Sequence, residues 1–100
     1  MKDIITHLDK AFDNRIRLGV MSMLVVNDWV DFTTLRDQLE VSDGNLASHL
    51  KALEKEEYIG LRKQFIGRRP NTSYQATELG RKAFSAHLAY LEQLIALQKD

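Results

Sequence analysis

The sequence predicts a mainly helical domain that carries one β-hairpin in its second half. Most of the chain places apolar residues at helical spacing, and its single proline, Pro70, lies late in the sequence. Residues 58–76 instead predict two short strands joined by a turn. A chain of 100 residues can bury a modest core, so we expect residues 1–100 to form a single domain.

The first quarter of the chain predicts two helical segments. The first has four apolar residues at helical spacing. Asn14 is then suited to cap a second helix over residues 15–26, which is apolar around most of its circumference and is therefore expected at the centre of the fold. Gly19 within it is expected to allow a close approach of another backbone. The apolar residues of the first segment are Ile4, Ile5, Leu8 and Phe12.

Two helices separated by a tight turn come next. After a very short strand at residues 29–32, Thr33 is expected to cap a helix over residues 34–39, and Ser42 a longer helix over residues 43–56. The longer helix carries three leucines at spacings of four and three residues, which predicts one buried stripe. A short helix, a tight turn and a longer helix form the helix-turn-helix plan. The three leucines are Leu46, Leu50 and Leu53.

The predicted hairpin is strongly basic. Between Tyr58 and Tyr74 it has four basic side chains and no acidic one, and its turn is predicted from Gly67, Pro70 and Asn71. Such a hairpin is suited to a phosphate backbone, although two arginines in a turn are also common on solvated loops. After the hairpin, Thr77 is expected to cap a last helix. The basic residues are Arg62, Lys63, Arg68 and Arg69.

With the leucines turned inward, the opposite face of the long helix is free to contact DNA. Asn45 can pair with adenine, while Ser48 and His49 can donate to bases or phosphates. Arginines of the hairpin tip can enter a minor groove. A solvated helix face is the alternative, since acidic residues at 54, 56 and 57 leave this helix net acidic. The predicted DNA-binding residues are Thr33, Ser42, Asp43, Gly44, Asn45, Ser48, His49, Lys51, Arg62, Lys63, Arg68, Arg69 and Asn71.

The last helix, over residues 78–99, is more apolar than one small core requires. It carries two adjacent apolar stripes, of which one can cover the core and the other is free to pack against a second copy of the chain. Packing of both stripes within one chain is the alternative. A two-fold homodimer predicts a palindromic DNA site. The predicted dimer residues are Ile4, Ile5, Leu8, Phe12, Phe84, Leu88, Leu91, Leu94 and Ile95.

Several functional classes are disfavoured by composition. The 14 basic and 14 acidic residues cancel, so net charge argues neither for nor against nucleic acid. The chain has no cysteine, no signal peptide pattern and no apolar run long enough for a membrane span, and we expect a cytoplasmic protein without membrane contact. His7, His49 and His87 are scattered, which favours neither a metal site nor catalysis. We therefore expect no enzyme activity and no cofactor.

The order of these segments resembles the winged helix-turn-helix transcriptional regulators of prokaryotes, of the MarR/ArsR-like type. The resemblance implies a DNA-binding homodimer with residues 43–56 as the recognition helix in the major groove. It implies residues 58–76 as a wing on the backbone or minor groove, and residues 78–99 as a dimerisation helix. Cysteine-rich metal sensing is not expected, and no small-molecule effector is identified. The resemblance lies in residues 15–18, 31–35, 41–54, 58–59, 67–70, 72, 74 and 77–80.

A protein-interaction module on the same scaffold is the rival hypothesis, because a fold alone does not decide function. The zero net charge and the acidic end of the long helix favour it. The hairpin without acidic residues disfavours it.

Overall fold

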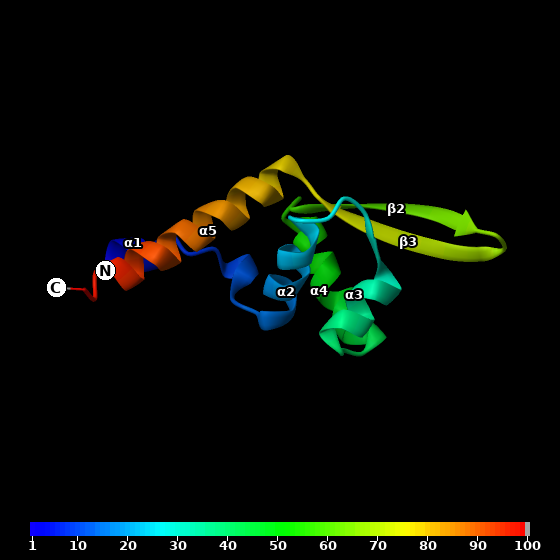
Figure 1. The fold of residues 1–100 in the computed structure, drawn as a ribbon, viewed down its shortest axis with the longest axis horizontal. Helices are drawn as coiled ribbons and strands as arrows, with labels where there is room; N and C mark the ends of the chain where they lie inside the picture. The colour runs from blue at the N-terminus through cyan, green and yellow to red at the C-terminus, as the bar shows by residue number, and fades with distance from the viewer. Residues whose placement is uncertain (100) are drawn as a thin grey trace.

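The computed structural model describes residues 1–99 and shows a small helical core from which a hairpin and a long helix project in opposite directions (Figure 1). The molecule is consequently elongated, with extents of 59 × 25 × 21 Å. This is the predicted class, mainly helical with a small antiparallel sheet. The elements are α1 (Lys2–Thr6), the 3-10 helix η1 (Lys10–Phe12), α2 (Arg15–Leu24), β1 (Val30–Asp31), α3 (Phe32–Leu39), α4 (Asp43–Lys55), β2 (Ile59–Ile66), β3 (Arg69–Ala76) and α5 (Glu78–Ala96).

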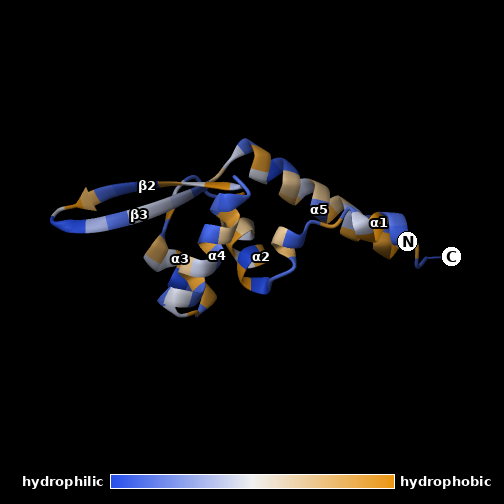
Figure 2. Cartoon of the chain, turned by 180° about the vertical axis from the view of Figure 1, so that it is seen from behind, coloured by the Kyte–Doolittle hydropathy of each residue, from blue (hydrophilic) through white to orange (hydrophobic). Residues whose placement is uncertain are grey.

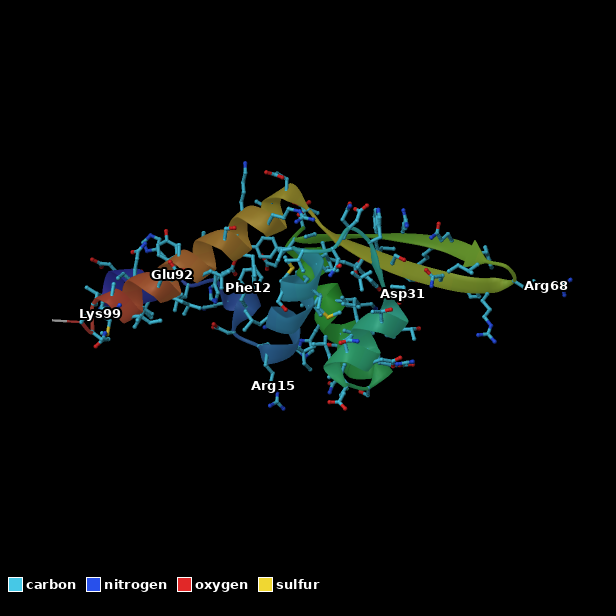
Figure 3. The ribbon with its side chains drawn as sticks, in the orientation of Figure 1. Phe12, Arg15, Asp31, Arg68, Glu92 and Lys99 are labelled. Carbon is cyan, nitrogen blue, oxygen red and sulfur yellow. The ribbon has the colours of Figure 1, made fainter. Side chains whose placement is uncertain are left out.

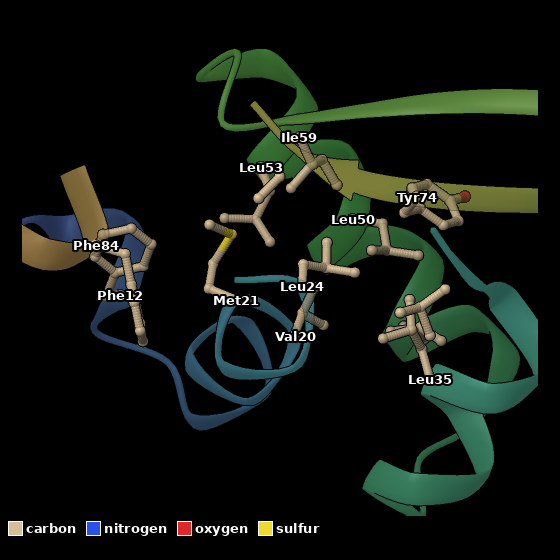
Figure 4. Close-up of a cluster of buried hydrophobic side chains, with 13 residues drawn as sticks. Phe12, Val20, Met21, Leu24, Leu35, Leu50, Leu53, Ile59, Tyr74 and Phe84 are labelled. Atoms are coloured by element: carbon tan, nitrogen blue, oxygen red, sulfur yellow. The ribbon is translucent and has the colours of Figure 1, made fainter. Parts of the chain in front are cut away.

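The hydrophobic core lies where α2, α3 and α4 meet the base of the hairpin (Figure 4). Leu46, Leu50 and Leu53 of α4 are all buried there, which confirms the predicted stripe. Removing such side chains from water is the main stabilising term for a domain of this size. The burial also fixes which face of α4 remains in solvent.

The central helix α2 is less buried than its sequence predicts. Val20, Met21 and Leu24 are fully buried, but Leu18 is exposed and the helix ends before Val26. The close approach at Gly19 comes from a side chain rather than a backbone, because a Cβ placed there would lie 2.6 Å from Leu39 Cδ2. The three-helix core is too small to cover every side of α2.

The sheet has three antiparallel strands in the order β1-β3-β2. The hairpin turn consists of Gly67 and Arg68 alone, since Ile66 pairs with Arg69. Gly67 has φ of +64°, and a positive φ at the first central residue matches the twist of a two-residue hairpin. The prediction that Pro70 belongs to the turn is therefore wrong. Pro70 lies within β3, beyond the part of that strand that pairs with β1, so its missing N–H leaves the ladder intact.

Three of the four predicted helix caps are confirmed. The side chains of Asn14, Ser42 and Thr77 each accept a hydrogen bond from the first turn of the helix that follows. Thr33 does not cap α3. Asp31 takes that position, and its carboxylate accepts from the Thr34 N–H at 2.8 Å. The hydrogen bonds from Thr34 lower the pKa of the Asp31 carboxyl, which confirms that its ionised form is stabilised there.

The N-terminal segment is broken into two pieces. Asp9 ends the first helical stretch because its side chain caps η1 through the Ala11 N–H. The Asp9 N–H also donates to His87 Nδ1 at 3.1 Å, which fastens the segment to α5. Phe12 then enters the core, where its ring meets that of Phe84 edge to face at 5.3 Å.

This packing corrects the predicted dimer surface. Phe12 and Phe84 are both buried by their own chain and are not available to a second copy. Sequence spacing could not show which apolar stripe of α5 faces the core.

The helix α5 continues well beyond the core, and α1 packs against its far end (Figure 1). Its N-terminus is held tightly, because a Cβ placed at Gly80 would lie 2.1 Å from the carbonyl oxygen of Tyr58. Within residues 1–99, no helix combines the length and apolar character that crossing a membrane requires.

Candidate nucleic-acid interface

The solvent face of α4 lies opposite its three buried leucines. Gly44, Ser48, Lys51 and Lys55 are exposed and fall on this face, since they follow one another at three- and four-residue spacing. The small residues Gly44 and Ser48 leave the middle of the face free of bulky side chains. The helix can therefore approach another molecule closely, as entry into a major groove requires.

Asn45 lies on the side of this face that looks toward α2. It is exposed and lines a shallow hollow together with Ser42 and Arg15. Arg15 is the first residue of α2 and extends into solvent (Figure 3). The sequence did not identify Arg15 as a site residue, because only the packing of α2 against α4 brings it beside the start of α4.

His49 is turned away from the centre of the face. It is half-buried, and its Nδ1 atom lies 3.0 Å from Nη1 of Arg17 on α2. A guanidinium can only donate, so Nδ1 accepts and the ring proton of the neutral side chain lies on Nε2. Burial, followed by the charge of Arg17, lowers the pKa of His49. His49 therefore offers a single N–H donor at the edge of the α4 face.

Asp43 also has a partner within the chain. Its carboxylate accepts from Nη1 of Arg36 on α3 at 3.1 Å, and Arg36 also contacts the neighbouring Asp37 at 3.0 Å. The hydrogen bonds to Asp43 and then Asp37 raise the pKa of Arg36. An exposed pair of this kind adds little stability, but it offsets the negative charge at the start of α4. That charge would otherwise oppose an approaching phosphate.

A groove with basic sides runs between α4 and the hairpin. Lys51 and Lys55 of α4 and Lys63 of β2 line it, and Glu54 is its single acidic residue. The groove is open to solvent and has a volume of about 600 Å³. Three ammonium groups around one open channel suit a phosphate backbone. Its apolar lining includes Leu61 and Tyr74.

The two faces of the hairpin differ. Lys63 and Leu61 lie on the face toward α4, whereas the intervening Arg62 lies on the other face, because side chains alternate along a strand. There the Arg62 guanidinium stacks over the ring of Trp29, with its carbon 4.3 Å from the ring centroid. The prediction that Arg62 and Lys63 act together is therefore wrong.

Asn71 and Thr33 occupy the base of the hairpin. Asn71 Nδ2 lies 3.5 Å from Oδ2 of Asp31, and Ser73 donates to Asn71 at 3.1 Å. Thr33 is exposed and lines a hollow between α3 and β3. Asn71 therefore has a structural role in fastening the hairpin to the start of α3.

Arg68 and Arg69 lie at the far end of the hairpin, where both are exposed (Figure 3). Within residues 1–99 neither has an ion-pair partner. Their charges are consequently free to attract an external anion.

A second surface of interest lies along α1 and α5 (Figure 2). Ile5, Leu88 and Ile95 are exposed, and several neighbouring apolar residues are only half-buried. The rings of His7 and Tyr90 lie 5.1 Å apart and join the two helices. The half-buried residues of this surface include Ile4, Leu8, Leu91 and Leu94.

These elements define a class of protein. A short helix, a tight turn and a longer helix with an exposed polar face form a helix-turn-helix, and the following hairpin is its wing. The chain belongs to the winged helix DNA-binding domain family, whose profile matches residues 16–95.

Individual proteins agree with this assignment. An uncharacterized protein of Methanocaldococcus jannaschii is 32% identical over 91 residues, which cover 91% of this chain and 96% of that protein. A solved structure of a transcriptional regulator homologue from Pyrococcus horikoshii OT3 is 27% identical, with a TM-score of 0.85 over 99% of this chain and 96% of that one. The YusO protein from Bacillus subtilis shares the fold, with a TM-score of 0.80 at 18% identity over 97% of this chain and 68% of that one. The predicted resemblance to prokaryotic winged helix regulators of the MarR/ArsR-like type is confirmed.

Proposed function

We propose that the chain is a sequence-specific transcriptional regulator that binds DNA as a homodimer. The carrying observation is that the open face of α4 and the basic side of the wing border one groove, which holds Lys51, Lys55 and Lys63. Membership of a DNA-binding family supports this reading. Neutral net charge does not oppose it, because the cationic groups gather on one side of one element.

In this proposal α4 enters the major groove. Ser48 and Asn45 contact base edges, and the small Gly44 permits close approach. His49, held by Arg17 with its proton on Nε2, donates to a phosphate or to a purine acceptor at the margin of the site. The backbone N–H groups at the start of α4, beside Ser42, favour a phosphate.

The wing supplies most of the affinity. Arg68 and Arg69 have no acidic partner among the described residues, so binding DNA requires no internal ion pair to be broken. Arg15, on the opposite side of α4, adds a phosphate contact at the other edge. Contacts on both sides would fix the register of α4 in the groove.

The homodimer is proposed from the exposed apolar surface of α1 and α5. Leu88 and Ile95 lie seven residues apart on one stripe of α5, and a two-fold copy would bury that stripe against itself. Two copies would then present two α4 helices to a palindromic site, with half-sites about 34 Å apart.

Selection of bound sequences from a random DNA pool, followed by binding measurements over a range of salt concentrations, tests the proposal. An enriched palindrome is expected. The variant Arg68→Ala/Arg69→Ala should bind more weakly and lower the slope of log K against log salt by about 1.8, at about 0.9 for each lost phosphate contact. The control Arg62→Ala/Lys82→Ala removes the same charge from outside the proposed interface and should keep the slope.

The rival function, a protein-interaction module, makes the opposite forecast. No sequence would be enriched, and both double variants would bind DNA equally poorly. The acidic residues Glu54, Glu56 and Glu57 at the end of α4 are the observation that favours it.

A further inference from the structure

The far end of the wing carries two large apolar side chains beside its charged turn. Phe65 is 74% exposed and Ile66 is 62% exposed, although the strand is only eight residues long. Figure 2 shows this apolar end of β2 next to the hydrophilic turn. A Phe left in water forgoes about 2 kcal/mol of burial energy, so the exposure of Phe65 requires an explanation.

The register of the hairpin gives Phe65 a direction. Leu61 and Lys63 line the groove shared with α4, and Phe65 is the next residue on that face of β2. Its cross-strand partner is Pro70, which is apolar and stiff. Ile66 lies on the opposite face and pairs with Arg69. Phe65 therefore points to the side on which α4 presents its lysines.

The surroundings of Phe65 select the partner. Lys63, Arg68 and Arg69 lie near it along the hairpin, and residues 58–74 contain no acidic side chain. Buried protein interfaces are depleted in unpaired charge, whereas a polyanion satisfies all these cations at once. Gly67 has no side chain, which keeps the two-residue turn narrow. An apolar side chain flanked by arginines on a slender tip fits a DNA minor groove.

Building on the proposed function, we infer that Phe65 is an apolar wedge that enters the minor groove beside the major-groove site and opens one base step. The arginines of the turn neutralise the phosphates on either side, and the phenyl ring contacts the partly unstacked bases. Opening a step is easiest at flexible pyrimidine–purine steps. The wing therefore selects such a step without hydrogen-bonding to it, and it bends the duplex there.

Fluorescence of 2-aminopurine tests the inference, because this base brightens when it is unstacked. The probe is placed at successive positions along a duplex obtained from the random-pool selection. Wild-type protein should raise the fluorescence at one step on each flank of the site and bring dyes at the duplex ends closer together. Phe65→Ala should abolish both signals and weaken binding about tenfold, while its thermal unfolding stays unchanged because the side chain is exposed.

Ile66→Ala is the matched control, since it removes an equally exposed apolar side chain from the other face of the same strand. It should keep both signals. Three results would overturn the inference: binding of the selected sequence with no brightened position, signals that persist in Phe65→Ala, or equal loss in both variants. A change in the mass of DNA-free protein caused by Phe65→Ala would reassign the residue to a contact between chains. Absence of any DNA binding would overturn the proposed function as well, which distinguishes the two failures.

Discussion

The wing and the helix α5 are alike in shape but differ in charge. Both project from the same core, in opposite directions, and both expose large apolar side chains (Figure 1). The wing, Ile59–Ala76, has four basic residues and no acidic one, whereas α5 has two of each, Glu78 and Glu92 against Arg81 and Lys82. Apolar exposure alone therefore does not identify a partner. The accompanying charge favours nucleic acid for the wing and a second copy of the chain for α5.

The two projections meet at one junction. The Thr77 N–H donates to the carbonyl of Tyr58 at 3.0 Å, and the Thr77 hydroxyl donates to the carbonyl of Glu57 at 2.7 Å. Tyr58 in turn donates to Asp9 at 2.5 Å, and burial together with this hydrogen bond raises the pKa of Tyr58 to about 12. The start of the wing, the start of α5 and the N-terminal segment are thus held together.

The largest expected effect breaks the proposed role of α5. Leu88→Asp with Ile95→Asp places two carboxylates on the exposed stripe and should yield a monomer that binds the selected palindrome about 100-fold more weakly, because the two half-sites are no longer linked. Light scattering coupled to size exclusion, with DNA titration, measures both. Ala86→Asp with Gln93→Asp has the same seven-residue spacing on the other exposed side of α5 and should remain dimeric. A wild-type chain that is monomeric at all concentrations would refute the assignment.

The junction itself gives the next largest effect. Gly80→Ala forces a methyl group against the Tyr58 carbonyl, whose backbone cannot move aside, and should lower the free energy of unfolding by about 2–3 kcal/mol. Gly44→Ala is the control, since it has open space in a helix and should raise that free energy by about 0.5–1 kcal/mol. Urea denaturation measures both. Equal stability of the two variants would contradict the close packing of α5 on the wing.

A smaller effect concerns the base of the wing. Asp31→Ala removes the cap of α3 and the contact to Asn71, and should cost about 1 kcal/mol. Thr33→Ala should have almost no effect on stability, because Thr33 caps nothing. Thermal unfolding of the two variants measures the difference. The reverse order would restore Thr33 as the cap.

The smallest effect is a pH dependence at the reading helix. The folded pKa of His49 is lowered, so below the ordinary histidine pKa of 6.5 the unfolded chain binds a proton more readily than the folded one. Stability should therefore fall slightly as pH drops from 7 through this range. Comparing the pH profile of urea unfolding in wild type and His49→Asn measures it, and the variant should show a shallower decline. Identical profiles would exclude a contribution from His49.

Local sequence rules predicted the parts of the fold that are decided locally. Three helix caps and the buried leucines of α4 follow from residue type and spacing, and all are confirmed. Asp31 and Thr33 are both good caps two residues apart, and only the pairing of β1 with β3 selects Asp31. Pro70 was misplaced for a similar reason, since its tolerance within β3 depends on where β1 ends.

The candidate site was predictable only in part. The basic wing and the polar side of α4 are visible in the sequence. The position of Arg15 beside α4, the stacking of Arg62 on Trp29 and the bond between His49 and Arg17 all join segments distant in the chain. For the same reason Phe12 and Phe84 were assigned to a dimer surface, although each completes the other's burial.

The guanidinium of Arg17 acts as a mechanical pin between the N-terminal arm and α4. Besides reaching His49, it donates through Nε to the carbonyl of Ala11 at 2.6 Å and through Nη2 to that of Lys10 at 3.4 Å. The arm it grips continues to the far end of α5, where a second protomer would sit. A change in how two protomers meet would thus strain the hydrogen bonds of a single side chain before it could alter the spacing of the two α4 helices.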